Sequence, residues 1–520
     1  MSGLQEQHIK LERLLSPIKP LAIVGSTEKT ISGLACNSQQ VQAGMLFFAL
    51  PGVKVDGFDY LPQALKAGAI AVVAERVPED CVEDVCYIKV ANVRQTMAVV
   101  GAEFYGHPTE GIPVIGVTGT NGKTTTTYLL EAIFKQAGFS PAVFGTIECR
   151  FGEVHYAASI TTPESLDLLR MMAEFRQQGA DVLILEVSSH ALEQHRVDGI
   201  NFDAAVFTNL TQDHLDYHET LERYFASKRR LFSELLGGGI AVINREDACG
   251  VGLLQENHNW ISFGLDNRAK VYPQQVTVGR DRISGTFASE QGNIVIESGM
   301  IGDFNVSNLL AAVTTAQQLG VSNEAIAKGI SLAPQVPGRV EKVKNDKGVL
   351  ALVDYSHTPG ALEQALKTLS KLDPKRLLTV VGCGGDRDKG KRPMMAAVAI
   401  HYSDLSIFTS DNPRTEDPLE ILAQIRSGAV AAGGHELNKG QVSTKGGFVV
   451  IPDRREAIEF AARMAGADDV LLVAGKGHED YQVLGTEKIH FDDREELARV
   501  LNEVKDSTVA GSRTEVGNHV

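Results

Sequence analysis

The sequence predicts an α/β fold divided into three domains, and three observations lead to this prediction. The chain has 520 residues, whereas one domain usually holds about 150. Short apolar runs repeatedly end in polar residues, and helical patterns lie between them, as in parallel sheets covered by helices. Breaks that contain glycine and proline, near residues 106–108 and 334–338, divide the chain.

The composition is that of a globular protein with an acidic balance. The 50 basic and 65 acidic residues give a formal charge of −15, which argues against nonspecific binding of nucleic acid. The six cysteines lack metal or disulfide spacing, which favours a reducing compartment. The N-terminus has no apolar signal segment, and no window approaches about 18 uninterrupted apolar residues. We therefore expect a soluble, cytoplasmic enzyme without membrane insertion. A monomer is expected as well.

Residues 1–108 predict a small α/β domain. A polar turn at Ser38 leads into an apolar strand at residues 45–50 and then into a Pro-Gly turn. A helix through residues 64–69 follows, and the break at residues 106–108 is predicted to be a linker.

The central region, residues 109–335, contains an apolar run at residues 113–117 that breaks into glycines before a helical pattern at residues 128–134. This order of strand, loop and helix predicts a phosphate loop, because backbone N–H groups and a helix N-terminus favour a polyphosphate. Lys123 adds a positive charge, and Thr124 offers a hydroxyl to Mg²⁺. The glycine spacing departs from the standard nucleotide-binding loop, and the alternative is a glycine-rich turn with a chance match. The predicted phosphate-binding residues are Gly119, Thr120, Asn121, Gly122, Lys123, Thr124 and Thr125.

Two further apolar runs in this region end in potentially catalytic residues. Residues 181–185 lead into a segment that begins at Glu186, and residues 204–207 lead into a segment that contains His214. Ligands of parallel α/β sheets bind beyond the carboxyl ends of the strands, so we expect these segments to converge on the phosphate loop. The run at residues 239–244 fits a further strand of the same sheet.

The third region, residues 336–505, predicts a doubly wound domain similar to a Rossmann fold, and the break before it is predicted to be a hinge. Its apolar runs again end in polar loops and are separated by helices. These runs are residues 350–353, 377–381, 406–409 and 470–473. Residues 506–520 have little apolar content and predict a disordered tail.

Taken in order along nearly the whole chain, the motifs resemble those of the ATP-dependent Mur ligases of peptidoglycan synthesis. Besides the phosphate loop, the motifs that carry the resemblance are Glu186-Val187-Ser188-Ser189-His190, the segment at residues 208–214, Asp354-Tyr355-Ser356-His357-Thr358-Pro359, and residues 384–393. The tetrapeptide Asp411-Asn412-Pro413-Arg414 is similar to that of members that add meso-diaminopimelate to UDP-N-acetylmuramoyl-L-alanyl-D-glutamate. The resemblance implies a UDP-sugar-binding domain at residues 1–108, an ATP-binding ligase domain at 109–335 and an amino-acid-binding domain at 336–505.

The resemblance implies that ATP phosphorylates the terminal D-glutamate carboxylate, and that the amine of the amino acid then attacks the acyl phosphate to form a tetrahedral intermediate. Two anions must be aligned and neutralised for this reaction. Two Mg²⁺ ions are implied, with Thr124 and Glu186 at one and His214 at the second. Lys123, Glu186, His214 and Lys228 are the implied catalytic residues.

Lys228 matches the position at which the family carries a carbamylated lysine. A carbamate formed with CO₂ is an anion that can support a metal ion, whereas an ammonium would repel it. Without the resemblance, Lys228 is one of three adjacent basic residues on a helix, and the alternative is a solvated helix face.

The resemblance also assigns substrate contacts, each to a matching position of this chain. Further contacts to ATP fall on Asn305, Arg339, Asp354 and His357. The UDP-sugar-peptide contacts fall on Cys36, Ser38, Val53, Lys54, Val55, Thr161, Thr162, Ser188, Gln194 and Arg196. Two positions depart from the family pattern, since Ile160 stands where asparagine is usual and Gly360 where aspartate is commoner.

For the amino acid, the matching positions are Arg387, Asp411, Asn412, Pro413, Arg414, Gly475 and Glu479. The distal end of diaminopimelate carries an ammonium and a carboxylate on one carbon, so Arg414 can hold the carboxylate while Glu479 accepts from the ammonium. Lysine lacks that carboxylate and would leave Arg414 unpaired. The alternative for Arg414 is a salt bridge within its loop, to Glu416 or Asp417.

Three other functions remain open at this point. A lysine-adding Mur ligase differs at the tetrapeptide, and a folylpolyglutamate synthase-like ligase shares the style of the phosphate loop but not the tetrapeptide. A nucleotide-regulated binding protein would hydrolyse ATP without ligation.

Overall fold

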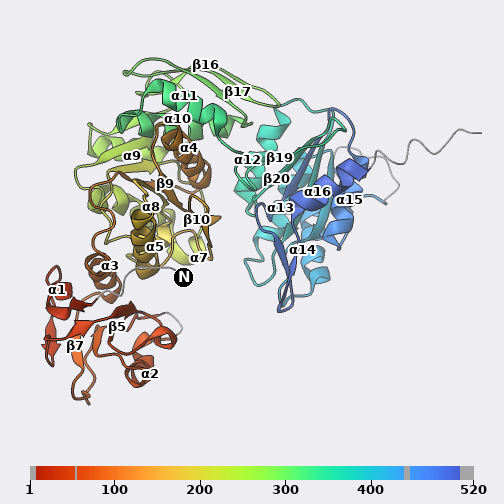
Figure 1. Cartoon of the computed structure of the whole chain (residues 1–520). Helices are drawn as coiled ribbons and strands as arrows, with labels where there is room; N and C mark the ends of the chain where they lie inside the picture. The colour runs from red at the N-terminus through yellow and green to blue at the C-terminus, as the bar shows by residue number, and fades with distance from the viewer. Residues whose placement is uncertain (1–7, 53–54, 439–445, 504–520) are drawn as a thin grey trace, which may run out of the picture. The chain divides into compact units, whose positions relative to one another are not determined.

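The computed structural model describes residues 8–52, 55–438 and 446–503 (Figure 1). By its internal contacts the chain divides into two compact units. Unit 1 comprises Met1–Val276, Gly285–Glu297 and Ser307–Ala333, and unit 2 comprises Thr277–Ser284, Ser298–Val306 and Pro334–Val520. The predicted N-terminal and central domains fall together in unit 1, so the boundary at residue 108 stays a prediction. The predicted tail at residues 506–520 lies outside the described residues.

A five-stranded sheet with the order β2-β7-β6-β5-β4 forms from the first hundred residues. β4 to β7 are parallel, and β2 pairs antiparallel with β7. The predicted helix at residues 64–69 ends earlier, because Gly68 adopts a left-handed φ of +103° and closes a turn. The elements are β1 (Ile9–Lys10), α1 (Leu11–Leu15), β2 (Ala22–Val24), β3 (Thr30–Ile31), β4 (Gly33–Ala35), η1 (Ser38–Gln40), β5 (Met45–Phe48), η2 (Gly57–Tyr60), α2 (Leu61–Lys66), β6 (Ala71–Ala74), β7 (Cys86–Lys89) and α3 (Val93–Phe104).

The second sheet of unit 1 has eight strands in the order β11-β10-β9-β12-β8-β13-β14-β15. The strands from β9 to β15 pair in parallel, and β10 and β11 complete one edge as antiparallel strands. β8 lies between β12 and β13, so the three predicted strand ends are neighbours. The strands are β8 (Val114–Thr118), β9 (Pro141–Phe144), β10 (Glu148–Phe151), β11 (Val154–Ala157), β12 (Val182–Glu186), β13 (Ala204–Phe207), β14 (Ile240–Asn244) and β15 (Ile261–Phe263).

Helices cover this sheet, and its central strands are therefore buried along their whole length. α4 packs against β8, β9 and β12 and against α11, while α5 contributes to a separate apolar cluster with the same sheet. The helical elements are α4 (Lys123–Gln136), α5 (Ser165–Gln177), α6 (Ser189–Glu193), α7 (Leu215–His218), α8 (Leu221–Arg230), the π-helical turn η3 (Leu231–Leu235), α9 (Ala248–Glu256), α10 (Asp303–Gln318) and α11 (Asn323–Leu332).

Unit 2 is built on a seven-stranded sheet with the order β19-β20-β25-β21-β22-β24-β23. All its pairs are parallel except β19 with β20. The strands, with a separate hairpin of β26 and β27, are β19 (Glu341–Val343), β20 (Leu350–Asp354), β21 (Leu377–Cys383), β22 (Leu405–Ser410), β23 (His435–Glu436), β24 (Gly447–Val450), β25 (Val470–Ala474), β26 (Tyr481–Leu484) and β27 (Glu487–His490).

Two apolar clusters sandwich the sheet of unit 2 and confirm a doubly wound arrangement. One cluster joins the sheet to α12, α13 and α14, and the other joins it to α15 and α16 (Figure 1). Successive residues of a strand, such as Leu471 and Leu472, belong to different clusters, because their side chains point to opposite faces of the sheet. The helices are α12 (Pro359–Ser370), α13 (Lys391–Tyr402), α14 (Pro418–Ala431), α15 (Arg454–Met464) and α16 (Asp493–Glu503).

A three-stranded sheet formed by β16 (Tyr272–Val278), β17 (Ile283–Ala288) and β18 (Ile294–Ser298) was not anticipated from the sequence. β16 consists of partly buried and exposed residues, and it lacks the continuous apolar run that marks the buried strands. All six cysteines are free thiols. Within the described ranges, no helix combines the length and apolarity needed to cross a bilayer.

Candidate active site

The predicted phosphate loop connects β8 to α4, and two of its glycines are required by the backbone. Gly119 and Gly122 have φ values of 150° and 88°, in the region that favours glycine. A Cβ atom would lie 1.9 Å from Thr208 Oγ1 at the first position and 2.4 Å from Asn308 Oδ1 at the second. The loop is held against β13 by hydrogen bonds from Thr120 N to Asn209 O and from Asn121 N to Asn209 Oδ1, both 2.9 Å long.

Two lysines meet at this loop. Lys123 Nζ donates to the carbonyl oxygens of Gly119 and Thr120, at 3.0 and 2.9 Å. Lys228 Nζ, on α8, also donates to Gly119 O at 3.0 Å, and its ammonium lies 4.5 Å from the ring centroid of Tyr224. The Lys228 side chain is 1% exposed, so the alternative of a solvated helix face is wrong. Burial, with a further contribution from Lys123, lowers the pKa of Lys228 well below its ordinary value.

Glu186, at the end of β12, is a buried carboxylate held by neutral donors. Thr124 Oγ1 donates to Oε2 at 3.1 Å, Thr146 Oγ1 donates to Oε2 at 2.8 Å, and Thr146 N donates to Oε1 at 3.0 Å. The structure thus brings Thr124 and Glu186 together as predicted. A buried carboxylate without a cationic partner among these donors is suited to a metal ion nearby.

His214 lies in the segment after β13 and begins α7 with a left-handed φ of 54°. Its ring lies 4.9 Å from that of His190 and 6.0 Å from that of Tyr224, measured between centroids. Burial lowers the pKa of His214; Asp213 opposes this effect, and Lys123 adds to it. A neutral imidazole is the form that binds a metal ion.

No group of three or more His, Cys, Asp or Glu side chains suited to a metal ion occurs in the described parts of the chain. The predicted set of Thr124, Glu186, His214 and Lys228 contains only two residues of those types, so a metal site there stays a prediction.

The peptide-side residues of the central region gather next to Glu186. Thr162 Oγ1 donates to Glu186 O at 2.8 Å and accepts from Ser188 N at 3.1 Å. Arg196 donates to Thr162 O at 2.9 Å and to Gln194 Oε1 at 2.7 Å. Thr161, the remaining member, accepts from Thr146 Oγ1 at 3.2 Å. Five residues assigned by resemblance therefore form one hydrogen-bonded group.

The predicted uridine-end residues belong to the first sheet of unit 1. Cys36 follows β4, and Ser38 Oγ donates to Gln63 Oε1 at 3.1 Å. Burial, and then the charge of Glu164, raise the pKa of the Cys36 thiol to about 11, which makes it a poor nucleophile at neutral pH. Val55 is 52% exposed. Two further predicted residues, Val53 and Lys54, lie outside the described residues.

In unit 2, three of the predicted ATP contacts lie around the end of β20. Asp354 is buried and accepts from Val340 N at 2.8 Å. The Arg339 guanidinium lies 5.0 Å from the ring centroid of Tyr355, and the His357 ring lies 4.7 Å from the same ring. Asn305, at the start of α10, is buried and donates to Ile301 O at 2.8 Å.

The predicted amino-acid contacts occupy loops after β21, β22 and β25 of unit 2. Gly385 N donates to Asn412 O at 2.9 Å, which places the loop of Arg387 against the tetrapeptide. Asn412 Nδ2 donates to Glu479 Oε2 at 2.9 Å, and Gly475, with φ 115°, lies close to Asp411.

Arg414 is not engaged in the salt bridge proposed as an alternative. Its guanidinium donates to Gly385 O at 2.7 Å. Glu416 instead pairs with Arg392 at 2.9 Å, and Asp417 caps α14. Within the described residues no carboxylate forms an ion pair with Arg414, and its backbone has a left-handed φ of 53°. Pro413 lies between Asn412 and Arg414.

The structure adds functional candidates that the sequence analysis missed. Thr146 holds Glu186, and Glu164 pairs with Arg196 at 2.5 Å and with Arg94 at 3.4 Å. Lys476 is completely buried among the residues of the tetrapeptide site. Thr146 follows β9 after one glycine, which is the same pattern of strand end and polar residue that identified Glu186, so a signal was present.

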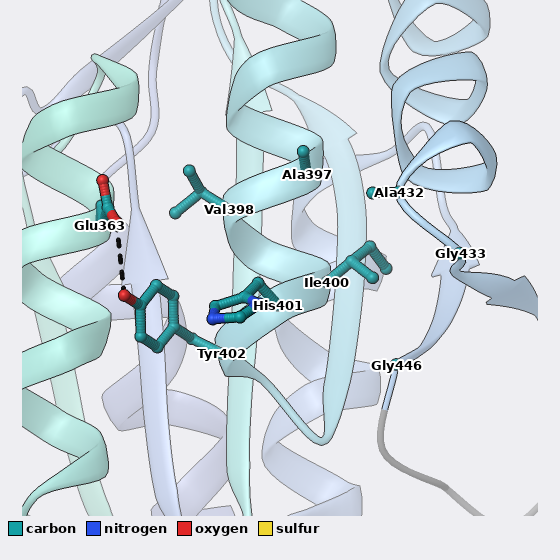
Figure 2. Close-up of a pocket in the computed structure, with 9 residues that line it drawn as sticks. All are labelled: Glu363, Ala397, Val398, Ile400, His401, Tyr402, Ala432, Gly433 and Gly446. Carbon is teal, nitrogen blue, oxygen red and sulfur yellow. Dashed lines mark hydrogen bonds between the residues drawn. The ribbon is translucent and has the colours of Figure 1, made fainter.

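A cavity of about 570 Å³ in unit 2 does not belong to this site (Figure 2). Its walls come from α12, α13 and the end of α14, and Tyr402 donates to Glu363 across one side. Tyr402 precedes β22, so the cavity lies at the amino ends of the strands, whereas the predicted residues follow the carboxyl ends. Its lining contains none of the predicted site residues.

Three family models match the chain in succession. Residues 30–105 match the Mur ligase family, catalytic domain; residues 117–316 match the Mur ligase middle domain; and residues 338–477 match the Mur ligase, glutamate ligase domain.

Similar proteins extend over nearly the whole chain. A UDP-N-acetylmuramoyl-L-alanyl-D-glutamate--2,6-diaminopimelate ligase of Geobacter metallireducens is 50% identical over 509 residues, covering 95% of this chain and 99% of that protein. The protein of the same name from Geobacter sulfurreducens is 49% identical, and the match covers 94% of this chain and 98% of that protein. A solved structure with this name is 33% identical, with a TM-score of 0.69, and covers 96% of this chain and all of that one.

Proposed function

Because the chain belongs to the Mur ligase family, we propose that it is the ATP-dependent ligase that adds meso-diaminopimelate to UDP-N-acetylmuramoyl-L-alanyl-D-glutamate, in the synthesis of peptidoglycan precursors. The observation that carries the choice of amino acid is the tetrapeptide loop. There the Arg414 guanidinium, which has no ion-pair partner among the described residues, shares one loop with Asn412, which binds the Glu479 carboxylate. A positive and a negative group in one site match the carboxylate and ammonium at the distal end of diaminopimelate.

The phosphate loop of unit 1 is proposed to bind the ATP phosphates. A carboxylate is a poor electrophile and repels ATP, so its phosphorylation needs positive charge and alignment. Lys123 supplies a charge at the loop, and the N-terminus of α4 directs N–H groups toward the anion. The γ-phosphoryl group moves to a carboxylate oxygen of D-glutamate, and ADP leaves.

Thr124 and Glu186 would hold one Mg²⁺ ion and His214 the second. The buried Glu186 carboxylate, whose donors among the described residues are hydroxyl and N–H groups, fits such a cation. Bound magnesium neutralises charge on the transferring phosphoryl group.

Lys228 is proposed to carry a carbamate. Only a neutral amine adds to CO₂, and complete burial beside Lys123 favours the neutral form of this side chain. The resulting anion would offset the charge of Lys123 and of the metal ions.

Further contacts to ATP are proposed for Asn305, Arg339, Asp354 and His357 of unit 2. Asp354 is buried, and the Arg339 and His357 side chains both lie beside the aromatic ring of Tyr355. Such a platform suits a base or ribose.

The UDP-sugar-peptide is proposed to bind along unit 1. Cys36, Ser38 and Val55 would contact the uridine end, whereas Thr161, Thr162, Ser188, Gln194 and Arg196 would contact the sugar-peptide. The proximity of the second group to Glu186 supports this assignment, because the D-glutamate carboxylate at the peptide end must reach the γ-phosphate of ATP, near the metal ion that Glu186 is proposed to hold.

After phosphorylation, the amine nitrogen of diaminopimelate attacks the acyl carbon. The nitrogen loses its proton, and phosphate leaves the tetrahedral intermediate. Arg387, Asp411, Asn412, Pro413, Arg414, Gly475 and Glu479 are proposed to position the amino acid. We further propose the domain boundaries near residues 108 and 335, a monomer and a cytoplasmic location.

Phosphate release with the UDP-linked dipeptide, ATP and each candidate amino acid tests this function. We expect release only when the dipeptide and diaminopimelate are both present, and transfer of ¹⁸O from a labelled D-glutamate carboxylate into the released phosphate. Release with lysine but not diaminopimelate would indicate the lysine-adding alternative, and release with a folate substrate the synthase-like alternative. Turnover of ATP without either substrate would instead indicate a nucleotide-regulated binding protein.

A further inference from the structure

We propose that Lys476 is a positioning residue for the amino-acid substrate, which sets diaminopimelate recognition by fixing the orientation of Asn412 and Glu479. This inference rests on the proposed function and adds to it a residue without an assigned role. It is carried by a complete set of hydrogen bonds around one buried ammonium.

Lys476 follows β25 and is fully buried. Its ammonium donates to Asn412 Oδ1 at 3.3 Å, to Glu479 Oε2 at 3.2 Å and to Tyr481 O. A lysine ammonium has three N–H groups, and each of them has an acceptor here. Such a group is rarely buried unless it is paired, so the buried ammonium holds its three acceptors in fixed positions.

The bonds to Glu479 leave one of its two oxygens for a ligand. Asn412 Nδ2 donates to Oε2 at 2.9 Å, and the Lys476 bond ends on the same atom. Among the described residues no hydrogen bond ends on Oε1, so this oxygen is the one that a substrate ammonium can reach. Lys476 and Asn412 together therefore set the rotamer of Glu479.

The same lysine joins the tetrapeptide loop to the hairpin of β26 and β27. Val483 N donates to Asn412 Oδ1 at 3.0 Å, and Gln482 Nε2 donates to Asp411 O at 2.6 Å. Arg414 N donates to Val483 O at 3.1 Å. The hairpin thus supports the backbone of the tetrapeptide, and Lys476 ties that assembly to Glu479.

A second buried ion pair supports the strands that precede these loops. Arg454 pairs with Asp493 at 2.7 Å, and both side chains are 0% exposed. Arg454 also donates to Ser410 O at 3.3 Å and to Ala474 O at 3.1 Å, at the ends of β22 and β25. The strand ends are therefore fixed independently of Lys476, so loss of the lysine should disturb the side chains of the site more than its backbone.

The test compares Lys476→Met with Lys347→Met in the full-length enzyme. Lys347 is a matched control because it is a half-buried lysine of the same unit that donates to one carbonyl, Ala462 O, at 3.0 Å and lies before β20. We expect Lys476→Met to raise the KM for diaminopimelate at least tenfold, with the KM values for ATP and the UDP-linked dipeptide within twofold of wild type. Lys347→Met should leave all three within twofold.

A double-mutant cycle with Glu479→Gln shows whether Lys476 acts through that carboxylate. If it does, the double variant should have a diaminopimelate KM within about threefold of Glu479→Gln alone. Lys476→Arg keeps the charge in a different shape, and we expect an intermediate KM. If circular dichroism shows that Lys476→Met is unfolded, the diaminopimelate KM of Lys476→Arg is compared with that of wild type instead.

An unchanged diaminopimelate KM in a folded Lys476→Met or Lys476→Arg enzyme would overturn the inference. Independent, multiplicative effects in the cycle would overturn it too, as would an equal rise of all three KM values, which indicates general damage. Wild-type activity separates this result from the proposed function: a wild-type enzyme that does not use diaminopimelate contradicts the function itself.

Discussion

Two buried lysines, one in each unit, have opposite surroundings. Lys476 directs its ammonium at three acceptors, one of them a carboxylate. Lys228 is buried as deeply, but its single acceptor in the described chain is Gly119 O, and a second cation, Lys123, lies near it. A lysine with three acceptors stabilises an arrangement, whereas a buried lysine with one carbonyl acceptor beside another cation costs free energy. The difference indicates a positioning role for Lys476 and a chemical role for Lys228.

The largest effect should follow removal of Lys228. Lys228→Ala is expected to lower kcat by about 10²- to 10³-fold, the usual effect of losing one group that stabilises transition-state charge. Initial rates of phosphate release measure the loss. Arg229→Ala is the control, because Arg229 lies on the same helix and forms an exposed ion pair with Glu256.

Two results would contradict a chemical role for Lys228 and so remove its distinction from Lys476. One is a Lys228→Ala enzyme that keeps more than half of its kcat. The other is mass analysis of active, bicarbonate-supplied wild type that finds a plain amine at Lys228.

The next effect concerns the amino-acid loop. Arg414→Ala should raise the KM for diaminopimelate by about 100-fold, because a charge-assisted pair contributes about 2–3 kcal/mol and each 1.4 kcal/mol is a factor of ten. The KM for ATP should not change. Arg426→Ala, which breaks an exposed ion pair with Glu436, is the control. Equal losses toward diaminopimelate and ATP would contradict the assigned role of Arg414.

A smaller effect on kcat should follow from removing a hydrogen bond that holds Glu186. Thr146→Ala removes a hydroxyl donor at 2.8 Å and should lower kcat by about tenfold, which corresponds to about 1.4 kcal/mol. Steady-state rates at saturating substrates measure it. Thr314→Ala removes a buried hydroxyl that bonds to Leu310 O in α10, and should leave kcat within twofold. A similar fall in both variants would show that Thr146 matters only for stability.

The smallest effect is on stability as a function of pH. Burial, with Arg339 next, lowers the pKa of His478 to about 4. Between about 6.5 and 4 the unfolded chain binds a proton that the folded chain does not, so stability falls as the pH falls through this range. His478→Gln should therefore flatten the fall of the unfolding midpoint of unit 2 from pH 7 to pH 4.5 by about a few degrees.

His490 provides a control of opposite sign. Its exposed ring pairs with Glu495 at 2.8 Å, and this hydrogen bond raises its pKa. Its contribution is present below the unfolded pKa and is lost as the pH rises through the folded value. Calorimetric scans in which His478→Gln and His490→Gln shift the pH dependence in the same direction would contradict this account.

The strand ends could be predicted from the sequence because buried parallel strands are continuous apolar runs that stop abruptly. The runs before Lys123, Glu186 and His214 became β8, β12 and β13, adjacent in one sheet. The sheet of β16 to β18 could not be predicted in this way, because β16 mixes partly buried and exposed residues and has no continuous buried run.

Partners far apart in the sequence were the part that could not be predicted. Glu164 pairs with Arg94 and Arg196, and no local pattern identifies such pairs. Lys476 did carry a signal, since it follows an apolar strand within Gly475-Lys476-Gly477, but whether it contacts a ligand or supports other side chains depends on burial. The sequence thus marked polar residues at strand ends, but it did not show which of them contact a ligand and which support other side chains.

A competition assay tests most directly the central claim, that the phosphate loop of unit 1 serves ATP and the tetrapeptide loop of unit 2 selects the amino acid that is attached. The wild-type enzyme receives ATP, the UDP-linked dipeptide, and meso-diaminopimelate and L-lysine at equal concentrations, and the products are identified by mass. We predict that the diaminopimelate product exceeds the lysine product by at least about 100-fold, the factor expected from the Arg414 pair. Comparable amounts of both products, or hydrolysis of ATP without any product, would contradict it.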